Sequence, residues 1–385
     1  MKPSKQPNRL SAFAVTAPGL EPICAAELRA LGIRGTIEEG GVAWKGELES
    51  VARANLWLRT ASRVLVRVAE FTAKAFYELE LHAKQIPWDR FVAPGAKVDF
   101  RVTCRKSKLY HSDAVAQRLA TALQRQVPAV QLESASDADD ENAAESDRQL
   151  FVVRFMRDVC TVSADSSGAL LHFRGYRQEL AKAPLRETLA AAVLLGAGWS
   201  GDTPLADPMC GSGTIPIEAA MIARRMAPGR ARSFAFLRWP RADKKMWSAL
   251  LDSARAGELP KSPVQIVGAD RDAGAIAAAR ANAERAGVAD DVIFVKQSIS
   301  ALAPADGPGL VVVNPPYGVR VGDAGPLKDL YAQLGNVMRK QRSGWTLGLL
   351  SADRALERQT RLPLEERFRT RNGGIPVHLV TAPTP

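Results

Sequence analysis

The sequence predicts an α/β protein whose two halves are organised differently. In the second half, short apolar strands alternate with helical segments, which is typical of a mostly parallel sheet covered by helices. In the first half, strands and helices alternate less regularly, which favours one or two small α+β units. A chain of 385 residues is also too long for one compact core, so we expect two or three domains.

The first half contains both strand and helix patterns. Residues 12–33 are expected to form a strand, a loop and a helix, residues 49–71 a helix and a strand, and residues 114–127 a further helix. Residues 131–149 are polar and acidic, and such a segment cannot bury a core. We expect it to form a mobile surface loop.

The second half carries the regular alternation. Residues 203–214 end a short strand in a glycine-rich turn. The Asn-Gly-Gly sequence at 372–374 separates two extended runs and predicts a hairpin, which would add an antiparallel edge to the sheet. Further strands are expected at 264–270, 291–297, 310–318 and 345–352, and helices at 215–227, 273–287 and 326–344.

The composition, with 46% hydrophobic and 24% charged residues, is that of a soluble globular protein. No apolar run approaches the roughly 18 residues of a membrane span, and residues 1–20 lack the apolar core of a secretory signal. The cysteines are widely spaced, with no CxxC pair and no adjacent His, so we expect reduced thiols in a cytoplasm and no metal site. They are Cys24, Cys104, Cys160 and Cys210.

The charge balance is basic. The 52 Lys and Arg residues outnumber the 41 Asp and Glu residues, which gives a formal net charge of +11. Such a protein is attracted to polyanions, because neutralised phosphates release their counterions. The charge favours a nucleic-acid partner without establishing one, since many basic proteins bind none.

The segment DPMCGSGT (207–214) is the strongest local motif. It follows a strand and precedes a helix, and Gly211 and Gly213 allow the backbone to turn tightly beside a ligand. It lacks the lysine of a phosphate-binding P-loop, and the next strand-end acid, Asp270, lies too far along the chain for a dinucleotide site. Asp207, four residues before Gly211, instead suits a ligand with a cationic end, such as S-adenosylmethionine. A glycine turn that serves packing alone is the alternative.

Asp270 ends the next strand, where adjacent loops of an open sheet converge on a ligand. Its carboxylate can accept hydrogen bonds from both hydroxyls of a ribose. Structural roles fit three other residues better, namely Asp272 as a helix N-cap, and Trp239 and Trp247 as local core.

The segment VVVNPPYG (311–318) joins an apolar strand to a rigid, polar corner. Asn314 can present its amide oxygen and Pro315 a carbonyl without a competing N–H, so the pair can accept both hydrogens of an exocyclic amine. Pro316 stiffens the corner, and Tyr317 can stack on a planar base. An amine held in this way aims its lone pair at an electrophilic methyl group, and catalysis then rests on proximity and alignment. The alternative is a proline turn that only ends a buried strand.

Together and in this order, DPMCGSGT, GADRDAGAI and NPPYGVR resemble the motifs of class I S-adenosylmethionine-dependent amino-methyltransferases. The chain more closely resembles the THUMP-domain RNA guanine-N2 methyltransferases, especially those that act on large-subunit ribosomal RNA. GLEPICAAEL, NLWLRTASRVL and KSKLYHSDAVAQR carry this resemblance in the first half, and LLHFRGYRQELAKAPLRETLAAAVL carries it at the junction. The resemblance implies a ferredoxin-like unit over residues 1–60, a THUMP-like RNA-binding domain over 61–165, and a Rossmann-like methyltransferase domain over 166–385.

The resemblance also implies S-adenosylmethionine as the cofactor and a role for each matching residue. Asp270 would hold the ribose, while Asn314, Pro315 and Tyr317 would hold a flipped guanine, with Asn314 also bordering the cofactor. One position departs from the family pattern, because Ser298 stands near the place where many relatives carry an acid that binds the adenine amine. The Ser298 hydroxyl or a backbone amide could make this adenine contact instead. The other residues implied to surround the cofactor are Thr188, Asp207, Pro208, Cys210, Gly211, Ser212, Gly213 and Thr214.

Two basic segments are candidates for RNA contact. RKSKLYHSD (105–113) combines cations with aromatic rings that could meet phosphates and a base. HFRGYRQ (172–178), at the junction of the two halves, could line an RNA path. The alternative for residues 105–113 is a solvated basic turn, and the alternative for residues 172–178 is a purely structural linker. The candidate residues are Arg105, Lys106, Lys108, Tyr110, Arg174 and Arg177.

The sequence therefore predicts a cytoplasmic enzyme that transfers a methyl group from S-adenosylmethionine to the N2 amine of a guanosine in 23S ribosomal RNA, without a metal ion. Transfer RNA or a DNA amine could replace ribosomal RNA as the substrate. An alternative of a different class is an RNA-binding or assembly factor that has lost turnover. A nicotinamide dehydrogenase fits worst, because the acid spacing is wrong for it and the NPPY sequence has no role in it.

Overall fold

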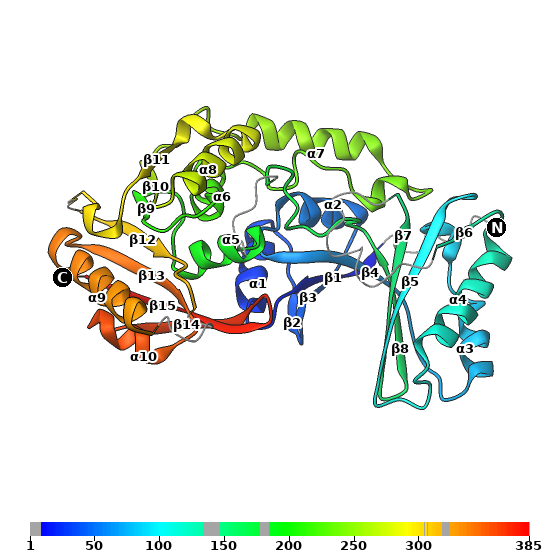
Figure 1. Ribbon diagram of the computed structural model, residues 1–385. Coiled ribbons are helices and arrows are strands. Elements are labelled where there is room, and N and C mark those ends of the chain that lie inside the picture. The colour runs from blue at the N-terminus through cyan, green and yellow to red at the C-terminus, as the bar shows by residue number, and fades with distance from the viewer. Residues whose placement is uncertain are drawn as a thin grey trace. The chain divides into compact units, whose positions relative to one another are not determined.

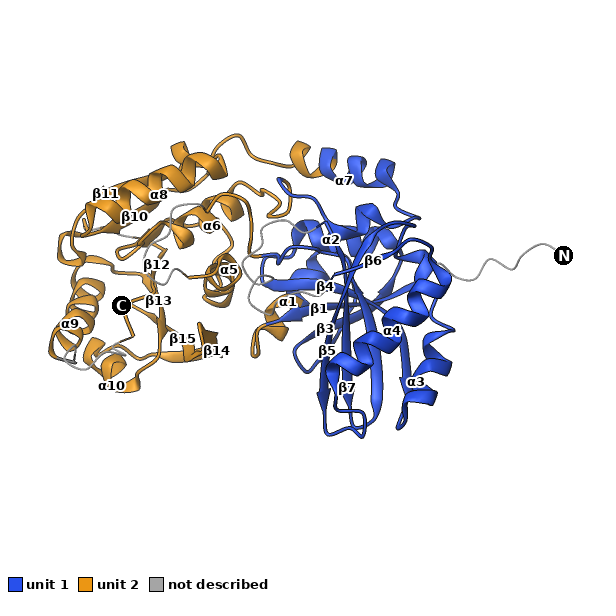
Figure 2. Cartoon of the chain, turned by 45° about the vertical axis from the view of Figure 1, so that its right-hand side comes forward, with its two compact units in different colours: residues 1–16, 25–171, 231–252 blue, residues 17–24, 172–230, 253–385 orange. Residues whose placement is uncertain are grey.

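The chain divides into two units, which are coloured separately in Figure 2. Unit 1 consists of residues 1–16, 25–171 and 231–252, and unit 2 of residues 17–24, 172–230 and 253–385. Most of the acidic segment that was expected to form a mobile loop, 134–146, lies outside the described residues. The computed structural model (Figure 1) describes residues 9–133, 147–177, 185–303, 305, 307–317 and 324–384.

One mixed sheet forms the framework of unit 1, and its strands are β1 (Leu10–Thr16), β2 (Thr36–Glu38), β3 (Gly41–Gly46), β4 (Ala61–Thr72), β5 (Lys97–Arg105), β6 (Gln131–Leu132), β7 (Gln149–Met156) and β8 (Val159–Asp165). Their order across the sheet is β2-β3-β1-β4-β8-β7-β5-β6. The long strand β4 pairs with β1 on one side and with β8 on the other. The domain boundary expected between residues 60 and 61 therefore falls where β4 begins, and the strands on both sides of it share one sheet.

Residues 231–252 belong to unit 1, although the sequence suggested an uninterrupted C-terminal domain. Aromatic packing explains the difference. The Trp239 indole N–H donates to the Gln149 side chain at 2.7 Å, and its ring lies edge-on to Phe91 with 5.0 Å between the ring centroids. Trp239 and Trp247 are both buried, as expected for local core. The helices with residues in unit 1 are α1 (Glu21–Ala30), α2 (Leu48–Trp57), α3 (Phe76–Ala83), η1 (Trp88–Arg90), α4 (Ser112–Gln126), η2 (Ala235–Arg238) and α7 (Lys244–Ala256).

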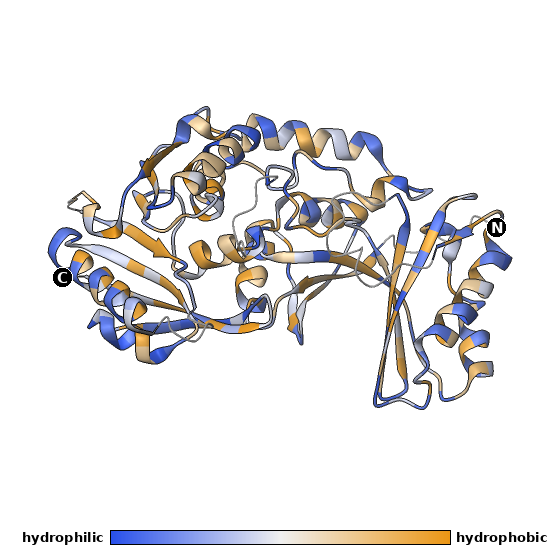
Figure 3. Cartoon of the chain, in the orientation of Figure 1, coloured by the Kyte–Doolittle hydropathy of each residue, from blue (hydrophilic) through white to orange (hydrophobic). Residues whose placement is uncertain are grey.

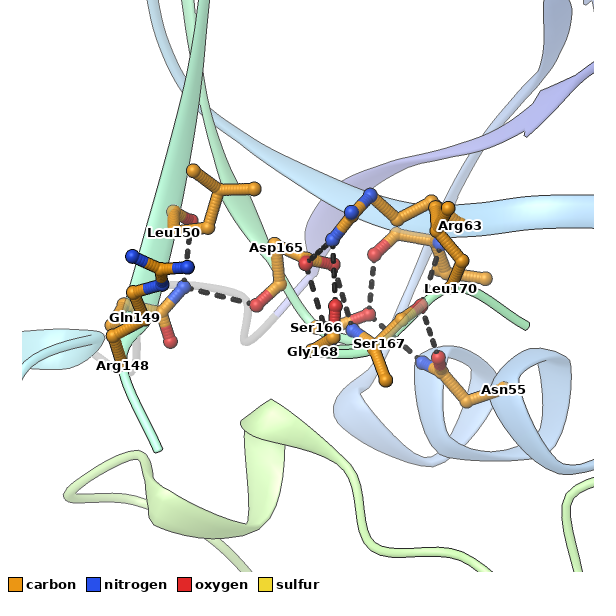
Figure 4. Close-up of polar contacts among 12 residues, drawn as sticks. Asn55, Arg63, Arg148, Gln149, Leu150, Asp165, Ser166, Ser167, Gly168 and Leu170 are labelled. Atoms are coloured by element: carbon orange, nitrogen blue, oxygen red, sulfur yellow. Dashed lines mark hydrogen bonds and ion pairs between the residues drawn. The ribbon is translucent and has the colours of Figure 1, made fainter. Parts of the chain in front are cut away.

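A buried polar cluster fixes the turn that follows β8 (Figure 4). The Arg63 guanidinium pairs with the Asp165 carboxylate and donates to the Gly168 carbonyl at 2.7 Å. Asp165 also accepts from the backbone N–H groups of Ser167 at 2.9 Å and Gly168 at 3.2 Å. The Ser167 hydroxyl in turn donates to Asn55 of α2 at 2.6 Å. Burial raises the pKa of Asp165 while the nearby Arg63 opposes the shift, so the carboxylate depends on these partners.

Unit 2 contains a second sheet, whose strands are β9 (Leu205–Asp207), β10 (Ile266–Asp270), β11 (Val292–Lys296), β12 (Gly309–Val313), β13 (Trp345–Ser351), β14 (Glu365–Asn372) and β15 (Ile375–Pro383). Their order is β11-β10-β9-β12-β13-β15-β14, with the first five strands parallel and the β14–β15 hairpin antiparallel. The predicted α/β sheet with an antiparallel edge is confirmed. The order switches at β9, because β10 and β11 lie on one side of it and β12 and β13 on the other. Open α/β sheets bind their ligands at such a switch point.

The apolar strand before the proline corner is buried on both faces. Leu310 and Val312 pack with residues of α5, α6 and α8, while Val311 and Val313 pack with residues of α9. Figure 3 shows the hydrophobic colouring along the central strands of this sheet and along α5. Asp272 caps α8, as expected, by accepting from the backbone N–H of Gly274 at 2.7 Å. The helices that lie wholly in unit 2 are α5 (Glu187–Gly196), α6 (Thr214–Ala223), α8 (Ala273–Ala286), η3 (Ala289–Asp291), η4 (Ile299–Ala301), α9 (Ala324–Gln341), α10 (Arg354–Glu357) and η5 (Arg358–Thr360).

Within the described ranges, no helix is both long enough and apolar enough to cross a bilayer. All four cysteines fall within these ranges, and none of them forms a disulfide bond.

Replacing Arg63 by Leu should destabilise unit 1, because the Asp165 carboxylate would stay buried without its cation. We expect the free energy of unfolding to fall by about 3–5 kcal/mol, measured by urea denaturation of the full chain. Arg118→Leu is the control, because its pair with Glu80 is exposed and should contribute no more than about 1 kcal/mol. Equal losses in the two variants would contradict the importance of burial at Asp165.

Candidate active site

The polar residues of the sequence motifs stand at one edge of the unit 2 sheet. Asp207 ends β9, Asp270 ends β10, and Asn314 directly follows β12. β9 lies between β10 and β12, and the three strands are parallel, with Gly268 of β10 opposite Asp207. Their carboxyl ends therefore meet at the same edge, and the structure brings both motifs together at the switch point of the sheet.

The glycine loop after β9 is held against β10. The Cys210 N–H donates to the Ala269 carbonyl at 2.9 Å, and the Gly211 N–H donates to the Asp270 carboxylate at 3.0 Å. Gly211 and Gly213 have φ angles of +54° and +84°, which favour glycine. A Cβ at Gly213 would lie 2.9 Å from a side chain of α8, whereas a Cβ at Gly211 would meet nothing within 4 Å. Gly213 thus serves helix packing, and the loop is open at Gly211.

Asp207 is a buried carboxylate that has no ion pair with any described basic side chain. It is 2% exposed and accepts a hydrogen bond from the Met209 N–H at 3.0 Å. Burial raises the pKa of Asp207 to about 8, with the Met209 bond opposing the shift and the charge of Asp270 adding to it. An ionised carboxylate in such a place needs a positive partner. The loop therefore fits a cationic ligand, and S-adenosylmethionine carries both an amino and a sulfonium group.

Asp270 links the two neighbouring loops. Its carboxylate accepts from the Asp272 N–H at 2.9 Å with one oxygen and from the Gly211 N–H at 3.0 Å with the other. Each oxygen can accept a second hydrogen bond, so the partly exposed carboxylate can still bind hydroxyl groups. In the described part of the chain, no three His, Cys, Asp or Glu side chains are grouped so that they could hold a metal ion.

The proline corner after β12 is joined to the sheet's edge hairpin. The Tyr317 hydroxyl donates to Asn314 Oδ1 at 2.6 Å, and Asn372 Nδ2 donates to the Tyr317 oxygen at 3.0 Å. Pro315 is buried and Pro316 exposed. Burial raises the pKa of Tyr317 to about 12, so the hydroxyl keeps its proton and can donate it. The sequence indicated Asn372 only as a turn residue, and its contact with Tyr317 was not predicted.

The other residues implied around the cofactor differ in exposure. Ser298 is exposed after β11, where its hydroxyl forms a hydrogen bond with that of Ser300 at 2.8 Å. Burial raises the pKa of the Cys210 thiol, which therefore stays protonated. The remaining residues of this group are buried, namely Thr188, Pro208, Ser212 and Thr214.

Two polar residues of α8 support the glycine loop from behind, and neither was predicted. The buried Asn282 side chain donates to the Ser212 carbonyl at 3.0 Å. Arg285 donates to the Asn282 oxygen at 2.5 Å and to the Tyr176 carbonyl at 2.8 Å. An Ala-rich helix carries no sequence signal for contacts of this kind, because they depend on the helix lying beside the loop.

Arg174 and Arg177, for which the sequence left RNA contact and a structural role open, are bound within unit 2. The Arg174 guanidinium lies 3.5 Å from the Glu218 carboxylate, to which the Tyr176 hydroxyl also donates at 3.2 Å. The Arg177 guanidinium lies 3.3 Å from the Glu187 carboxylate, whose pKa burial raises to about 7. Buried charges need such partners, so these arginines stabilise the interior of unit 2.

The basic segment of unit 1 is exposed, as an RNA contact would require. Arg105 ends β5, Lys106 and Lys108 follow it at the surface, and Tyr110 is 68% exposed. The Lys108 N–H donates to the Asp158 carboxylate at 2.7 Å, which ties this segment to the β7–β8 turn.

Comparison with known families gives two matches. Residues 174–381 match the RMKL-like methyltransferase domain. The matched range contains the glycine loop, Asp270 and the proline corner, together with nearly all of the unit 2 sheet. Residues 11–65 match the RlmL ferredoxin-like domain, which covers the first strands of unit 1. The expected methyltransferase domain and ferredoxin-like unit are therefore confirmed as fold assignments.

The chain is similar to curated proteins over nearly its whole length. It is 36% identical to the candidate RNA methyltransferase slr0064 of Synechocystis sp., with 96% of this chain and 95% of slr0064 aligned. It is 37% identical to the ribosomal RNA large subunit methyltransferase K/L of Syntrophotalea carbinolica over 96% of this chain. The aligned region is 53% of that relative, so the chain spans about half the length of the K/L protein.

Among solved structures, the chain resembles the candidate methyltransferase SMU.472, which was determined with SAH, the demethylated form of S-adenosylmethionine. The TM-score is 0.87 at 30% sequence identity, and the alignment covers 99% of both chains. The similarity agrees with the cofactor that the glycine loop and Asp207 predict.

Asp207 should make the stability of the protein depend on pH. Its carboxyl keeps its proton up to about pH 8 in the folded chain but only to about pH 4 in the unfolded chain. The folded state then binds more protons between these values, so the free energy of unfolding should fall as the pH rises, by up to about 1.4 kcal/mol per pH unit. Asp207→Asn should lack this contribution when the two proteins are compared by urea denaturation at both ends of the range. The same pH dependence in both proteins would show that Asp207 titrates normally.

Proposed function

Because the chain belongs to the family of RMKL-like methyltransferases, we propose that it transfers a methyl group from S-adenosylmethionine to an exocyclic amine of an RNA base. The specific target that we propose is N2 of a guanosine in large-subunit ribosomal RNA. The observation that carries the proposal is the polar corner after β12, which lies at the same sheet edge as Asp207 and Asp270.

The glycine loop has the features that the cofactor requires. S-adenosylmethionine supplies an electrophilic methyl group attached to a sulfonium. Asp207 would bind a cationic group of the cofactor, which would favour the ionised carboxylate against the effect of burial. Asp270 would accept from the ribose hydroxyls, and Gly211 leaves space beside the loop because it has no side chain.

The corner after β12 would hold the target amine by two acceptors. Asn314 Oδ1 and the Pro315 carbonyl can each accept one N–H of the amine, which directs its lone pair away from both oxygens. The ring of Tyr317 offers a face on which the base can stack. The chain's contribution to the rate is then alignment of the amine. The amine proton leaves to water or a carbonyl after transfer, so no side chain is assigned as a general base.

Unit 1 is proposed to bind the RNA, as a THUMP-like domain would, in the cytoplasm. A base must leave its stack to reach Asn314, at a cost of a few kcal/mol that other contacts have to offset. The exposed Arg105, Lys106 and Lys108 can meet phosphates, and Tyr110 can stack on a base. The net charge of +11 favours the same partner. The name of the K/L relative suggests the ribosomal target.

Modified nucleosides from cells with and without this gene test the substrate. We expect N2-methylguanosine to disappear from the large-subunit ribosomal RNA fraction when the nucleosides are measured by mass spectrometry. Its loss from transfer RNA instead would keep the chemistry and change the substrate. No change in any RNA fraction would refute the proposed RNA target.

Asn314→Ala should lower the rate of methyl transfer by about 100-fold or more, because it removes an acceptor that holds the amine. Cofactor affinity, measured by calorimetry with S-adenosylhomocysteine, should change little. Asp270→Ala is the complementary variant and should weaken cofactor affinity first. Full transfer activity in Asn314→Ala would exclude the role assigned to this residue.

Lys106→Glu combined with Lys108→Glu should weaken RNA binding to a similar extent for all sequences. Each lost phosphate contact should also reduce the slope of log affinity against log salt by about 1. Lys244→Glu combined with Lys245→Glu makes the same change in charge on an exposed helix of unit 1 and serves as the control. Equal effects of the two pairs, measured by filter binding over a range of salt concentrations, would mean that only net charge matters.

A further inference from the structure

A chain of two hydrogen bonds connects the edge hairpin of unit 2 to the proposed substrate corner. Asn372 Nδ2 donates to the Tyr317 oxygen at 3.0 Å, and the Tyr317 hydroxyl donates to Asn314 Oδ1 at 2.6 Å. Asn372 is the last residue of β14, just before the tip of the hairpin at Gly373 and Gly374. All three polar side chains are partly buried. The hairpin, which is remote in sequence from the NPPY motif, thus contacts the motif directly.

The direction of the two bonds determines how each polar group is turned. A hydroxyl has a single hydrogen, and an asparagine amide has a donor side and an acceptor side. Because Asn372 donates to the Tyr317 oxygen, the hydroxyl hydrogen is directed to Asn314. The oxygen of the Asn314 amide, and not its NH₂ group, must then face Tyr317. Hydrogen bonds linked in this way polarise and strengthen one another.

The orientation of the Asn314 amide matters for an incoming amine. The amide oxygen can accept two hydrogen bonds, and Tyr317 uses one of them. No other described residue donates to this oxygen, so its second acceptor position can take an N–H of the substrate. If the Asn314 amide were turned over, its NH₂ group would face the substrate amine, and the two donors could not bond to each other.

We propose that Asn372 is a positioning residue for methyl transfer, which keeps the Asn314 oxygen turned toward the target amine by acting through the Tyr317 hydroxyl. The inference rests on the proposed function, because it concerns the same corner. It adds the β14–β15 hairpin to the parts of unit 2 that determine the reaction.

The most informative variant is Asn372→Asp. Aspartate has nearly the shape of asparagine, but its carboxylate can only accept hydrogen bonds. The Tyr317 hydroxyl would therefore turn toward the new carboxylate and release Asn314. We expect the single-turnover rate at saturating RNA to fall by about tenfold, the effect of losing roughly one hydrogen bond. Asn372→Ala should lose a similar amount. If Asn372→Asp kept the normal rate while Asn372→Ala did not, packing would explain the role of Asn372, and the inference would be wrong.

A double-mutant cycle tests whether Asn372 acts through Tyr317. Tyr317→Phe keeps the ring and removes the hydroxyl, so Asn372→Asp should cause no further loss of rate in that background. Additive losses would overturn the inference. Asn336→Asp, which makes the same change at an exposed asparagine of α9, is the control and should leave the rate unchanged.

A measurement without substrate separates this inference from the proposed function. In protein labelled with ¹⁵N at asparagine, the side-chain NMR signals of Asn314 can be identified by their absence in Asn314→Ala. We expect them to shift in both Tyr317→Phe and Asn372→Asp. Unchanged signals would refute the connection between the three residues. Shifted signals in a protein that methylates no RNA would support the connection and reject the proposed function alone.

Discussion

The hydrogen bond from the Gly211 N–H to the Asp270 carboxylate joins the ends of two parallel strands, and the candidate site is built around it. It bends the loop after β9 toward β10, while Asp207 remains buried close enough for the charge of Asp270 to raise its pKa further. Two ionised carboxylates at this sheet edge would be unfavourable without a cation, and the pKa of Asp207 is raised accordingly. A ligand that brings positive charge removes this cost, so its binding is linked to the stability of the fold.

The positions that the sequence predicts well share one property, which is that a local pattern determines where the residue stands in its strand or helix. Asp207 and Asp270 end apolar strands and Asn314 follows one, and the carboxyl ends of neighbouring parallel strands must meet. The helix cap at Asp272 is equally local, since its partners are the next residues of the chain. Strand endings and caps can therefore be predicted from the sequence without knowledge of the tertiary fold.

The residues whose roles the sequence did not predict are those positioned by contacts between distant segments of the chain. Asn372 reaches Tyr317 only because the β14–β15 hairpin pairs beside β13, and Asn282 reaches the glycine loop only because α8 packs beside it. Arg174 resembled a surface residue, since nothing in its neighbourhood indicated that Glu218 of α6 would lie opposite. The assignment of residues 231–252 to unit 1 could not be predicted for the same reason. It depends on contacts such as the hydrogen bond from Trp239 to Gln149, which lies in a strand far earlier in the chain.

The division of the chain into units has a consequence for how the protein is made. Unit 1 includes residues 231–252, so it cannot be completed until β9 and α6 of unit 2 have already left the ribosome. Unit 2 in turn contains Leu20 in its hydrophobic core, so it retains a segment from the start of the chain. Most multidomain proteins fold one domain after another during synthesis. In this chain, both units are still incomplete while residues 172–230 are being synthesised. Cleavage of the chain at any one position would also fail to separate the two units, because their segments alternate along the sequence.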